Sequence, residues 1–315
     1  MSAAVLEKKI SVGIFALNEE GSIGPLIDAL LSQNLRQVQL IELIVVSFGS
    51  TDGTNRIVLE KAQRDARVHL EAEPRCLGKA TSVARFLTIA RGELLVLVSG
   101  DSELRSTDTV YHLIQPLLHE PEVGCVGARH RISNPGEGFV AFAGQRVWST
   151  LDLVSCIDPK ISGDLMVLRA GIASDIPAGT INDDAYLEIV CLQRGLRKRY
   201  CRQAEVFIRI PERLQEYVSQ RRRIYVGHRQ LEQLFPDRRL STMRIPILVG
   251  LMAWQVTSAR TLAYSLLLMA IDAAIRVQAR LDDRAARYPE GRWPVISSTK
   301  YRAYGNSARS IDGGG

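Results

Sequence analysis

Residues 94–101 read LLVLVSGD, five apolar residues followed by a serine, a glycine and a carboxylate. An apolar run this short is typical of a strand that is buried on both faces, as in a parallel sheet covered by helices. Ligands of open α/β sheets bind beyond the carboxyl ends of the strands. We therefore expect Asp101 at the ligand-binding edge of a sheet, with Gly100 leaving room for a large group. A plain Asp-Ser turn is the alternative that this stretch alone leaves open.

Predicted strands and helices alternate on both sides of this stretch, with short connections between them. The strands are predicted at residues 10–17, 42–47, 68–71 and 123–128, and the helices at residues 22–33, 55–67, 79–91 and 107–119. This alternation predicts an α/β fold with a mostly parallel sheet, right-handed crossovers and helices on both faces. The strand-end loops then gather four polar residues on one edge: Glu19, Asp52, Lys79 and Asp101. Neither a Walker A loop nor a G-x-G-x-x-G motif is present.

The second half is predicted to be less regular and carries an uneven charge. Helices are expected at residues 139–156 and 211–235, short strands at 165–169 and 206–210, and an acidic helix start at Asp183-Asp184. Between Arg194 and Arg239 thirteen Lys and Arg stand against five Asp and Glu. Such a patch suits phosphates, an anionic membrane or nucleic acid, or is simply a solvated helix face.

Composition indicates the class of protein, and the C-terminal third indicates how the chain can meet a membrane. The chain has 315 residues, is 46% hydrophobic and 23% charged, and has five cysteines without a C-x-x-C pair. These values predict a globular protein of a reducing compartment. Residues 245–275 are apolar but interrupted by Arg260 and Asp272, and a charge at mid-membrane costs about 2.5–3.5 kcal/mol. We expect an interfacial helical pair, while a helical hairpin packed on the sheet domain or on another subunit stays open. The predicted domains are residues 1–240, 241–281 and a loosely ordered polar tail, 282–315.

The carboxylates and arginines suit one kind of chemistry. Asp101 at a sheet edge suits Mg²⁺ or Mn²⁺, which prefer oxygen ligands and bridge to phosphates. A second carboxylate from the Asp183-Asp184 pair suits a general base. The arginines of residues 220–223 suit a leaving diphosphate, because guanidinium groups pair bidentately with phosphate oxygens. Together these parts describe displacement of a nucleoside diphosphate by a deprotonated acceptor.

Several motifs appear in the order found in one known family. They are IFALNEEGSI (14–23), VVSFGSTDGT (45–54), Gly78-Lys79, ARGE (90–93), Ser99-Gly100-Asp101, Ser162-Gly163 with Arg169, Asp183-Asp184 and QRRRI (220–224). The chain resembles a family 2 glycosyltransferase with the GT-A fold, particularly the membrane-associated branch. In that resemblance residues 99–101 stand for the D-x-D metal motif, residues 183–184 for Glu-Asp, and residues 220–224 for Q-x-x-R-W.

The resemblance implies an inverting transfer from a nucleotide-sugar donor to the hydroxyl of a lipid-linked or saccharide acceptor. Asp184 is then the catalytic base, with Asp183 beside it, and Asp101 holds a divalent cation, Mg²⁺ or Mn²⁺. The implied donor-binding residues are Ala16, Glu19, Ser47, Lys79, Gly100, Asp101, Gln220 and Arg223. The implied location is the cytoplasmic face of the cell membrane, and an oligomer stays open.

Four positions depart from the family pattern. Ser47 and Phe48 stand where an Asp is usual, and Phe48 can stack on a base instead. Ser99 replaces the first Asp of D-x-D, which leaves Asp101 and the oxygens of diphosphate and water as metal ligands. Ile224 replaces the Trp, which favours a single transfer over processive synthesis.

These departures also motivate a second hypothesis of another class. It is a degenerate, non-catalytic GT-A domain that binds a nucleotide or a protein partner. Nucleic-acid binding ranks last, because the basic patch lacks interleaved aromatic residues and any recognised binding module. We therefore expect no nucleic-acid partner.

Overall fold

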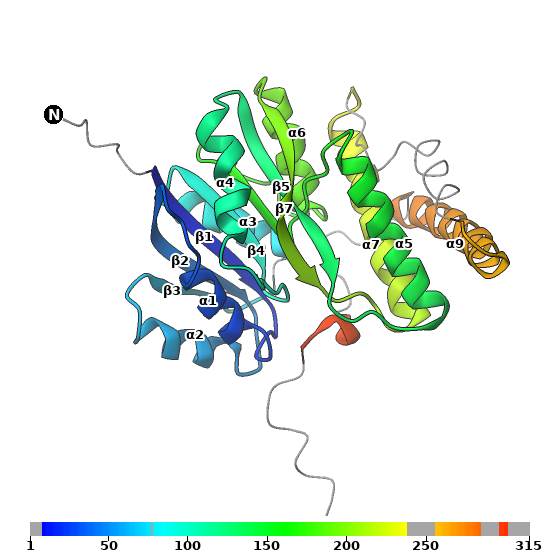
Figure 1. The fold of residues 1–315 in the computed structure, drawn as a ribbon, viewed down its shortest axis with the longest axis horizontal. Coiled ribbons are helices and arrows are strands. Elements are labelled where there is room, and N and C mark those ends of the chain that lie inside the picture. The colour runs from blue at the N-terminus through cyan, green and yellow to red at the C-terminus, as the bar shows by residue number, and fades with distance from the viewer. Residues whose placement is uncertain (1–7, 77, 238–255, 285–295, 302–315) are drawn as a thin grey trace, which may run out of the picture.

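The computed structural model describes residues 8–76, 78–237, 256–284 and 296–301 (Figure 1). The strands are β1 (Lys8–Ala16), β2 (Val38–Phe48), β3 (Val68–Glu73), β4 (Leu94–Ser99), β5 (Val123–Ile132), β6 (Leu165–Arg169) and β7 (Arg197–Ile208). The helices are α1 (Ile23–Leu31), α2 (Thr54–Ala62), α3 (Lys79–Ile89), α4 (Thr109–His119), α5 (Gly138–Ser155), α6 (Asp183–Gln193), α7 (Leu214–Leu234) and α9 (Ala259–Arg284), with a short 3₁₀ helix, η2 (Ser297–Thr299).

All seven strands form one sheet in the order β3-β2-β1-β4-β6-β5-β7. Neighbouring strands are parallel except β6, which runs antiparallel to both β4 and β5. The predicted mostly parallel α/β sheet is therefore confirmed. Because β6 runs backwards, the residues that precede it lie at the carboxyl end of β4. Ser99 at that end accordingly donates from its amide to the Asp164 carbonyl, at 3.2 Å.

The sheet is the core of the molecule, and helices cover both of its faces. Strand β4 is buried along its whole length, as its unbroken apolar run predicts. Leu94, Val96 and Val98 pack with α1, α2 and α4 on one face, whereas Leu95 and Leu97 pack with α3 and α6 on the other. The alternation along β4 thus fixes which helices lie on which side.

Two predicted elements differ from the structure. Strand β7 has twelve residues, where the sequence predicted a short strand at 206–210. Its first seven residues, RKRYCRQ, are too basic to look like a strand, but β7 pairs with β5 along this part of the sheet. Helix α7 begins at Leu214 and not at Pro211, because residues 211–213 serve as the connection from β7.

Helices α5, α7 and α9 lie together beside the sheet, at the right of Figure 1. Their contact is a small apolar core that includes Ala143 of α5, Tyr225 of α7 and Ile275 of α9. Helix α9 therefore packs on the sheet domain, one of the two arrangements expected for the apolar stretch. Residues 245–255, where the other helix of the expected pair falls, lie outside the described residues.

Residues 296–301 dock against the sheet domain. Thr299 is buried, and Ser298 and Tyr301 form hydrogen bonds with residues of the domain. The prediction of a loosely ordered tail is wrong for these six residues. Their binding depends on polar partners that are brought close only by the fold.

Candidate active site

A cavity of about 610 Å³ opens at the carboxyl ends of β1 and β4 and extends between α5, α7 and α9. Seven of the predicted site residues line it: Glu19, Lys79, Asp101, Asp183, Asp184, Gln220 and Arg223. Ala16, Ser47 and Gly100 are buried and are not among the residues that line it. The Ser47 hydroxyl instead bonds the Ser50 hydroxyl at 2.9 Å in the loop after β2. The cavity thus gathers residues from loops and helices that are far apart in the sequence.

The β1 loop carries Glu19 into the cavity. Asn18 adopts a positive φ of 56°, which turns the chain sharply after the strand. The Glu19 amide donates to the Thr54 hydroxyl at 2.8 Å, and this bond ties the loop to α2. Burial, and then the charge of Asp101, raise the pKa of Glu19 to about 7, while Lys300 lowers it.

Two charged residues mark the end of β4. Burial raises the pKa of Asp101, against the opposing charges of Lys300 and Lys79. The Lys79 ammonium donates to the Ser99 hydroxyl at 2.8 Å and to the Gly163 carbonyl at 3.1 Å. Burial acts to lower the pKa of Lys79, but the surrounding aspartates, Asp183 first, outweigh it and raise that pKa. Lys79 is therefore a partly buried cation with carboxylates around it.

The α6 start provides the two aspartates with different electrostatic surroundings. Asp184 accepts the Gly163 amide at 3.1 Å and the Ala185 amide at 2.8 Å, and Lys160 lies 3.9 Å away. Burial acts to raise the pKa of Asp184, but Lys160, Lys79 and these amides together lower it. Burial raises the pKa of Asp183 and prevails there. Asp184 is therefore the one held ionised.

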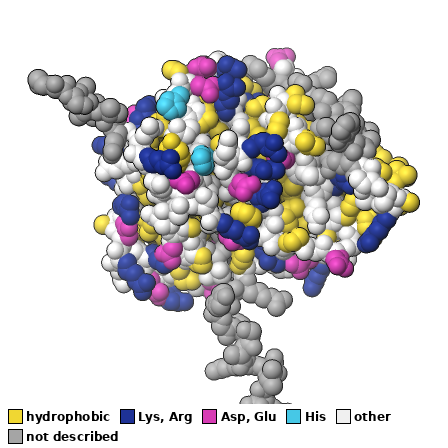
Figure 2. Space-filling view, in the orientation of Figure 1, with side chains coloured by type: hydrophobic (Ala, Val, Ile, Leu, Met, Phe, Trp, Pro, Cys, Tyr) yellow, Lys and Arg dark blue, Asp and Glu magenta, His cyan; other side chains and the backbone are white. Residues whose placement is uncertain are grey.

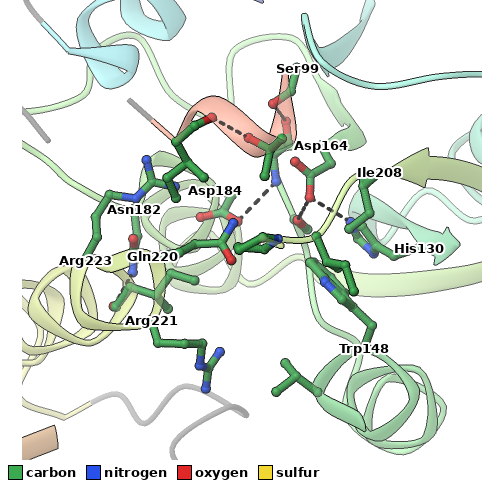
Figure 3. Close-up of a pocket in the computed structure, with 18 of the residues that line it drawn as sticks. Ser99, His130, Trp148, Asp164, Asn182, Asp184, Ile208, Gln220, Arg221 and Arg223 are labelled. Atoms are coloured by element: carbon green, nitrogen blue, oxygen red, sulfur yellow. Dashed lines mark hydrogen bonds and ion pairs between the residues drawn. The ribbon is translucent and has the colours of Figure 1, made fainter. Parts of the chain in front are cut away.

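Helix α7 closes the cavity beside α6. The Asn182 side chain donates to the Ile224 carbonyl at 2.9 Å and joins the two helices. They approach so closely at Gly227 that a Cβ there would lie 2.6 Å from the Asn182 side chain. Figure 3 shows that this packing turns Gln220 and Arg223 toward the space around Asp184.

The far side of the cavity has a group that sequence reasoning missed. The His130 and Trp148 rings stack with centroids 4.2 Å apart, and His130 Nε2 lies 3.1 Å from Asp164 Oδ2 (Figure 3). Nearby lining residues are mostly apolar: Val147, Leu151, Ile208, Ile210, Leu268 and Met269. The only sequence signal was Trp148 within a predicted helix. An aromatic, apolar wall of this kind suits the non-reacting part of an acceptor.

The residues next to Gln220 and Arg223 have mainly structural partners. Arg221 contacts the Tyr225 hydroxyl at 2.6 Å and Asp272 of α9 at 3.5 Å, although it also lines the cavity. Arg222 pairs with Asp282, also on α9. Arg169 belongs to a motif that resembles the family's acceptor-side strand, but its guanidinium donates to the backbone carbonyls of Leu117, Glu120 and Val123. It therefore fixes the end of α4 and the start of β5 to β6.

Solved structures share this architecture. A Pyrobaculum calidifontis mannosyltransferase, solved with GDP-Man and Mn²⁺, has a TM-score of 0.58 at 19% identity, over 90% of this chain and 85% of that one. A Mycobacterium tuberculosis glucosyl-3-phosphoglycerate synthase, solved with Mn²⁺, UDP and glucosyl-3-phosphoglycerate, has a TM-score of 0.51 at 21% identity, over 69% of this chain and 78% of that one. These similarities confirm the predicted GT-A fold.

The family model described as glycosyl transferase family 2 matches residues 11–144, which include the strand-end loops that carry Glu19, Lys79 and Asp101. Residues 11–144 are therefore similar to a glycosyl transferase family 2 domain. The predicted resemblance to this family is thereby confirmed over residues 11–144.

Curated relatives match the chain over part of their length. A glucosyl-3-phosphoglycerate synthase from Mycolicibacterium paratuberculosis is 34% identical over 182 residues, 55% of this chain and 55% of that protein. A dolichyl-phosphate beta-glucosyltransferase from Trichomonas vaginalis is 34% identical over 67 residues, 21% of this chain and 20% of that protein. The chain thus spans about half the length, or less, of these two relatives.

Proposed function

We propose that this protein transfers a sugar from a nucleotide-sugar donor to an acceptor hydroxyl, with inversion at the anomeric carbon. The observation that carries the proposal is the single cavity that joins Asp101, Asp184 and Arg223. The relatives named above are synthases and transferases of sugars, which supports the same class of reaction here. An acceptor would bind against the aromatic, apolar wall, on the side of the cavity away from the donor.

In this proposal Asp184 is the general base. Its lowered pKa keeps the carboxylate ionised, so it can take the proton from the acceptor hydroxyl. The acceptor oxygen then forms a bond to the anomeric carbon, and the bond from that carbon to the diphosphate breaks on the opposite face. The electron pair leaves with the nucleoside diphosphate. Lys79, Gln220 and Arg223 stabilise the charge that develops there.

We propose that a divalent cation accompanies the donor, since the solved neighbours named above contain Mn²⁺. When bound, the cation supplies positive charge that neutralises the leaving diphosphate. Asp101 fits this role, because its carboxylate lines the cavity at the end of β4. Within the described ranges no group of three or more His, Cys, Asp and Glu side chains is placed to hold a metal. The cation would therefore share its ligands between Asp101, the donor and water.

The proposed acceptor is lipid-linked, and the proposed location is a membrane surface on its cytoplasmic face. Ala259–Asp282 within α9 is long and apolar enough to cross a membrane by length and composition alone. However, Asp272 and Arg276 on this helix pair with each other and with α7, so we propose that α9 lies on the surface. Leu268 and Met269 of α9 line the cavity, which would place the apolar part of an acceptor next to the membrane.

A binding panel tests the proposed donor site. Thermal unfolding of the purified chain is measured with UDP-, GDP- and dTDP-sugars, each with and without Mn²⁺ or Mg²⁺. We expect one nucleotide class to stabilise the protein, and more so with metal, by about 2.7 kcal/mol at a hundred times the dissociation constant. No shift with any donor, for a folded protein, would favour a non-catalytic domain that binds a protein partner.

A further inference from the structure

Residues 296–301 are anchored firmly at the mouth of the cavity. The Ser298 hydroxyl bonds Glu216 of α7 and accepts the Glu212 amide at 3.1 Å. The Tyr301 hydroxyl donates to Glu103 at 3.2 Å. These bonds hold the segment on both sides of Lys300. Figure 1 shows η2, in red, below the sheet and far in sequence from α7, to which it is hydrogen-bonded.

This docking places the Lys300 ammonium inside the donor end of the cavity. The ammonium donates to the Leu17 carbonyl at 3.0 Å and pairs with the Glu19 carboxylate. The side chain of Lys300 is only 23% exposed, and that of Glu19 is 4% exposed. A lysine that reaches this far into a pocket, through a segment with its own anchors, is positioned by the fold and not by chance.

The Lys300 ammonium has bonding capacity left for a ligand. An ammonium has three N–H donors, and two of them are used by Leu17 and Glu19. Among the residues that the structure describes, no third acceptor bonds it. Lys79 shows the same pattern at the other side of β4, with two bonds to Ser99 and Gly163. Two lysines thus border the end of β4, each with one donor available to an incoming anion.

Ser99 makes this charge arrangement unusual for the end of β4. A carboxylate at this position would add one more negative charge beside Lys79, whereas the Ser99 hydroxyl adds none to those of the surrounding aspartates. We propose that Lys300 binds the diphosphate of the donor, opposite Lys79, and that the 296–301 segment is a permanent wall of the donor site. The two lysines then supply part of the positive charge that stabilises the diphosphate.

The test rests on the proposed function, because it needs a donor site that binds a nucleoside diphosphate. Calorimetric titrations compare UDP and GDP with uridine and guanosine, in Mn²⁺ and in a chelator. We expect Lys300→Met to weaken binding of the diphosphate that the wild type prefers, on the order of ten- to hundredfold, in both conditions. Binding of the matching nucleoside should change little, because it lacks the phosphates. Lys300→Arg should keep most of the affinity.

A control variant and two contrary outcomes make the test decisive. Lys61→Met removes a lysine of similar exposure, on α2, that pairs with Asp28 of α1. It should leave the affinities for the diphosphate and for the nucleoside unchanged. If the wild type binds neither diphosphate, and dTDP does not bind either, the proposed function fails and this inference fails with it. If the wild type binds one and Lys300→Met binds it equally well, only the inference fails. Tighter binding by Lys300→Met would show instead that Lys300 plugs the site.

Discussion

Asp184 is held ionised by its neighbours before any substrate arrives. The nearest cation is Lys160, at 3.9 Å, and two backbone amides donate to the carboxylate. We expect Asp184→Asn to keep the nucleotide affinity but to lower turnover of the donor by about 10² to 10⁴. Calorimetry measures the first quantity, and release of nucleoside diphosphate from the nucleotide sugar measures the second.

Asp175→Asn is the control for this variant, because Asp175 is exposed on the loop before α6. It should leave both quantities at the wild-type level. Normal turnover by Asp184→Asn would contradict the assignment of Asp184 as base, whereas loss of nucleotide affinity would assign it to donor binding.

His228 of α7 makes stability depend on pH. It is 3% exposed, and its Nδ1 has no hydrogen-bond partner in the described part of the chain. Burial, with the charge of Lys160, lowers its pKa to about 3. At this histidine the unfolded chain therefore binds a proton as the pH falls below about 6.5, whereas the folded chain does not. The stability from this group is complete above pH 6.5 and falls as the pH drops toward 3, by about 2 kcal/mol at pH 5.

We expect His228→Gln to remove this part of the acid sensitivity. Urea unfolding between pH 5 and pH 7.5 should give a flatter dependence of the unfolding free energy on pH than in the wild type. His69→Gln is the control, because His69 is exposed on β3 and should leave the slope unchanged. Parallel wild-type and His228→Gln curves would mean that His228 titrates normally in the folded state.

At a strand end, the sequence predicts which residues line the cavity. Asp101 follows the apolar run of β4 and Lys79 begins the helix after β3, and the edge of a parallel sheet brings such positions together. His130, Trp148 and Lys300 could not be found in this way. Their places depend on contacts between β5, α5 and the 296–301 segment, and no local pattern encodes those contacts. Ser47 shows the converse, since its motif position is clear but its side chain is buried behind the cavity.

At the scale of elements, apolar runs determine what can be predicted. Strand β4 is apolar at every position but its last and was located within a residue or two. Strand β7 begins RKRYCRQ and was largely missed, because its pairing with β5 outweighs its composition. The direction of β6 was equally hidden, since a five-residue apolar strand carries no signal for parallel or antiparallel pairing. That direction nevertheless places residues 163–164 at the active edge.

A partly buried charge cluster joins α9 to α7. Asp272 of α9 accepts Arg276 Nε at 2.7 Å and the Tyr225 hydroxyl, and Arg221 lies 3.5 Å away. We expect Asp272→Ala to destabilise the protein by about 3–5 kcal/mol, because it leaves two largely buried arginines without their carboxylate. Urea unfolding measures the loss, and limited proteolysis should show α9 cleaved first.

Glu60→Ala provides the comparison for Asp272→Ala. Glu60 pairs with Arg56 on α2, where both side chains are at least half exposed. Removing this surface pair should change stability by less than about 1 kcal/mol. Equal effects of the two variants would show that the α7–α9 cluster is not a stabilising contact.

At the scale of the whole molecule, α9 has two faces with different surroundings. One face carries Leu268 and Met269 into the cavity. The other exposes a stripe of large apolar residues at helical spacing: Leu262, Leu266, Val277 and Leu281. Figure 2 shows hydrophobic side chains, with basic ones beside them, at the right-hand end of the molecule, where α9 lies in Figure 1. An apolar stripe with adjacent positive charge is typical of a helix that binds an anionic membrane surface.

We expect the chain to sediment with vesicles that contain anionic lipid, and Leu266→Glu to weaken that binding about tenfold or more. The substitution replaces an apolar contact with a charge that the membrane repels, in the middle of the stripe. Leu59→Glu is a matched control, because Leu59 of α2 is 52% exposed and Leu266 is 55% exposed. It should bind vesicles as the wild type does. If Leu266→Glu binds vesicles as well as the wild type does, the stripe contacts something other than lipid. A lower molecular mass of Leu266→Glu than of the wild type in solution would indicate that the stripe binds a second copy of the chain.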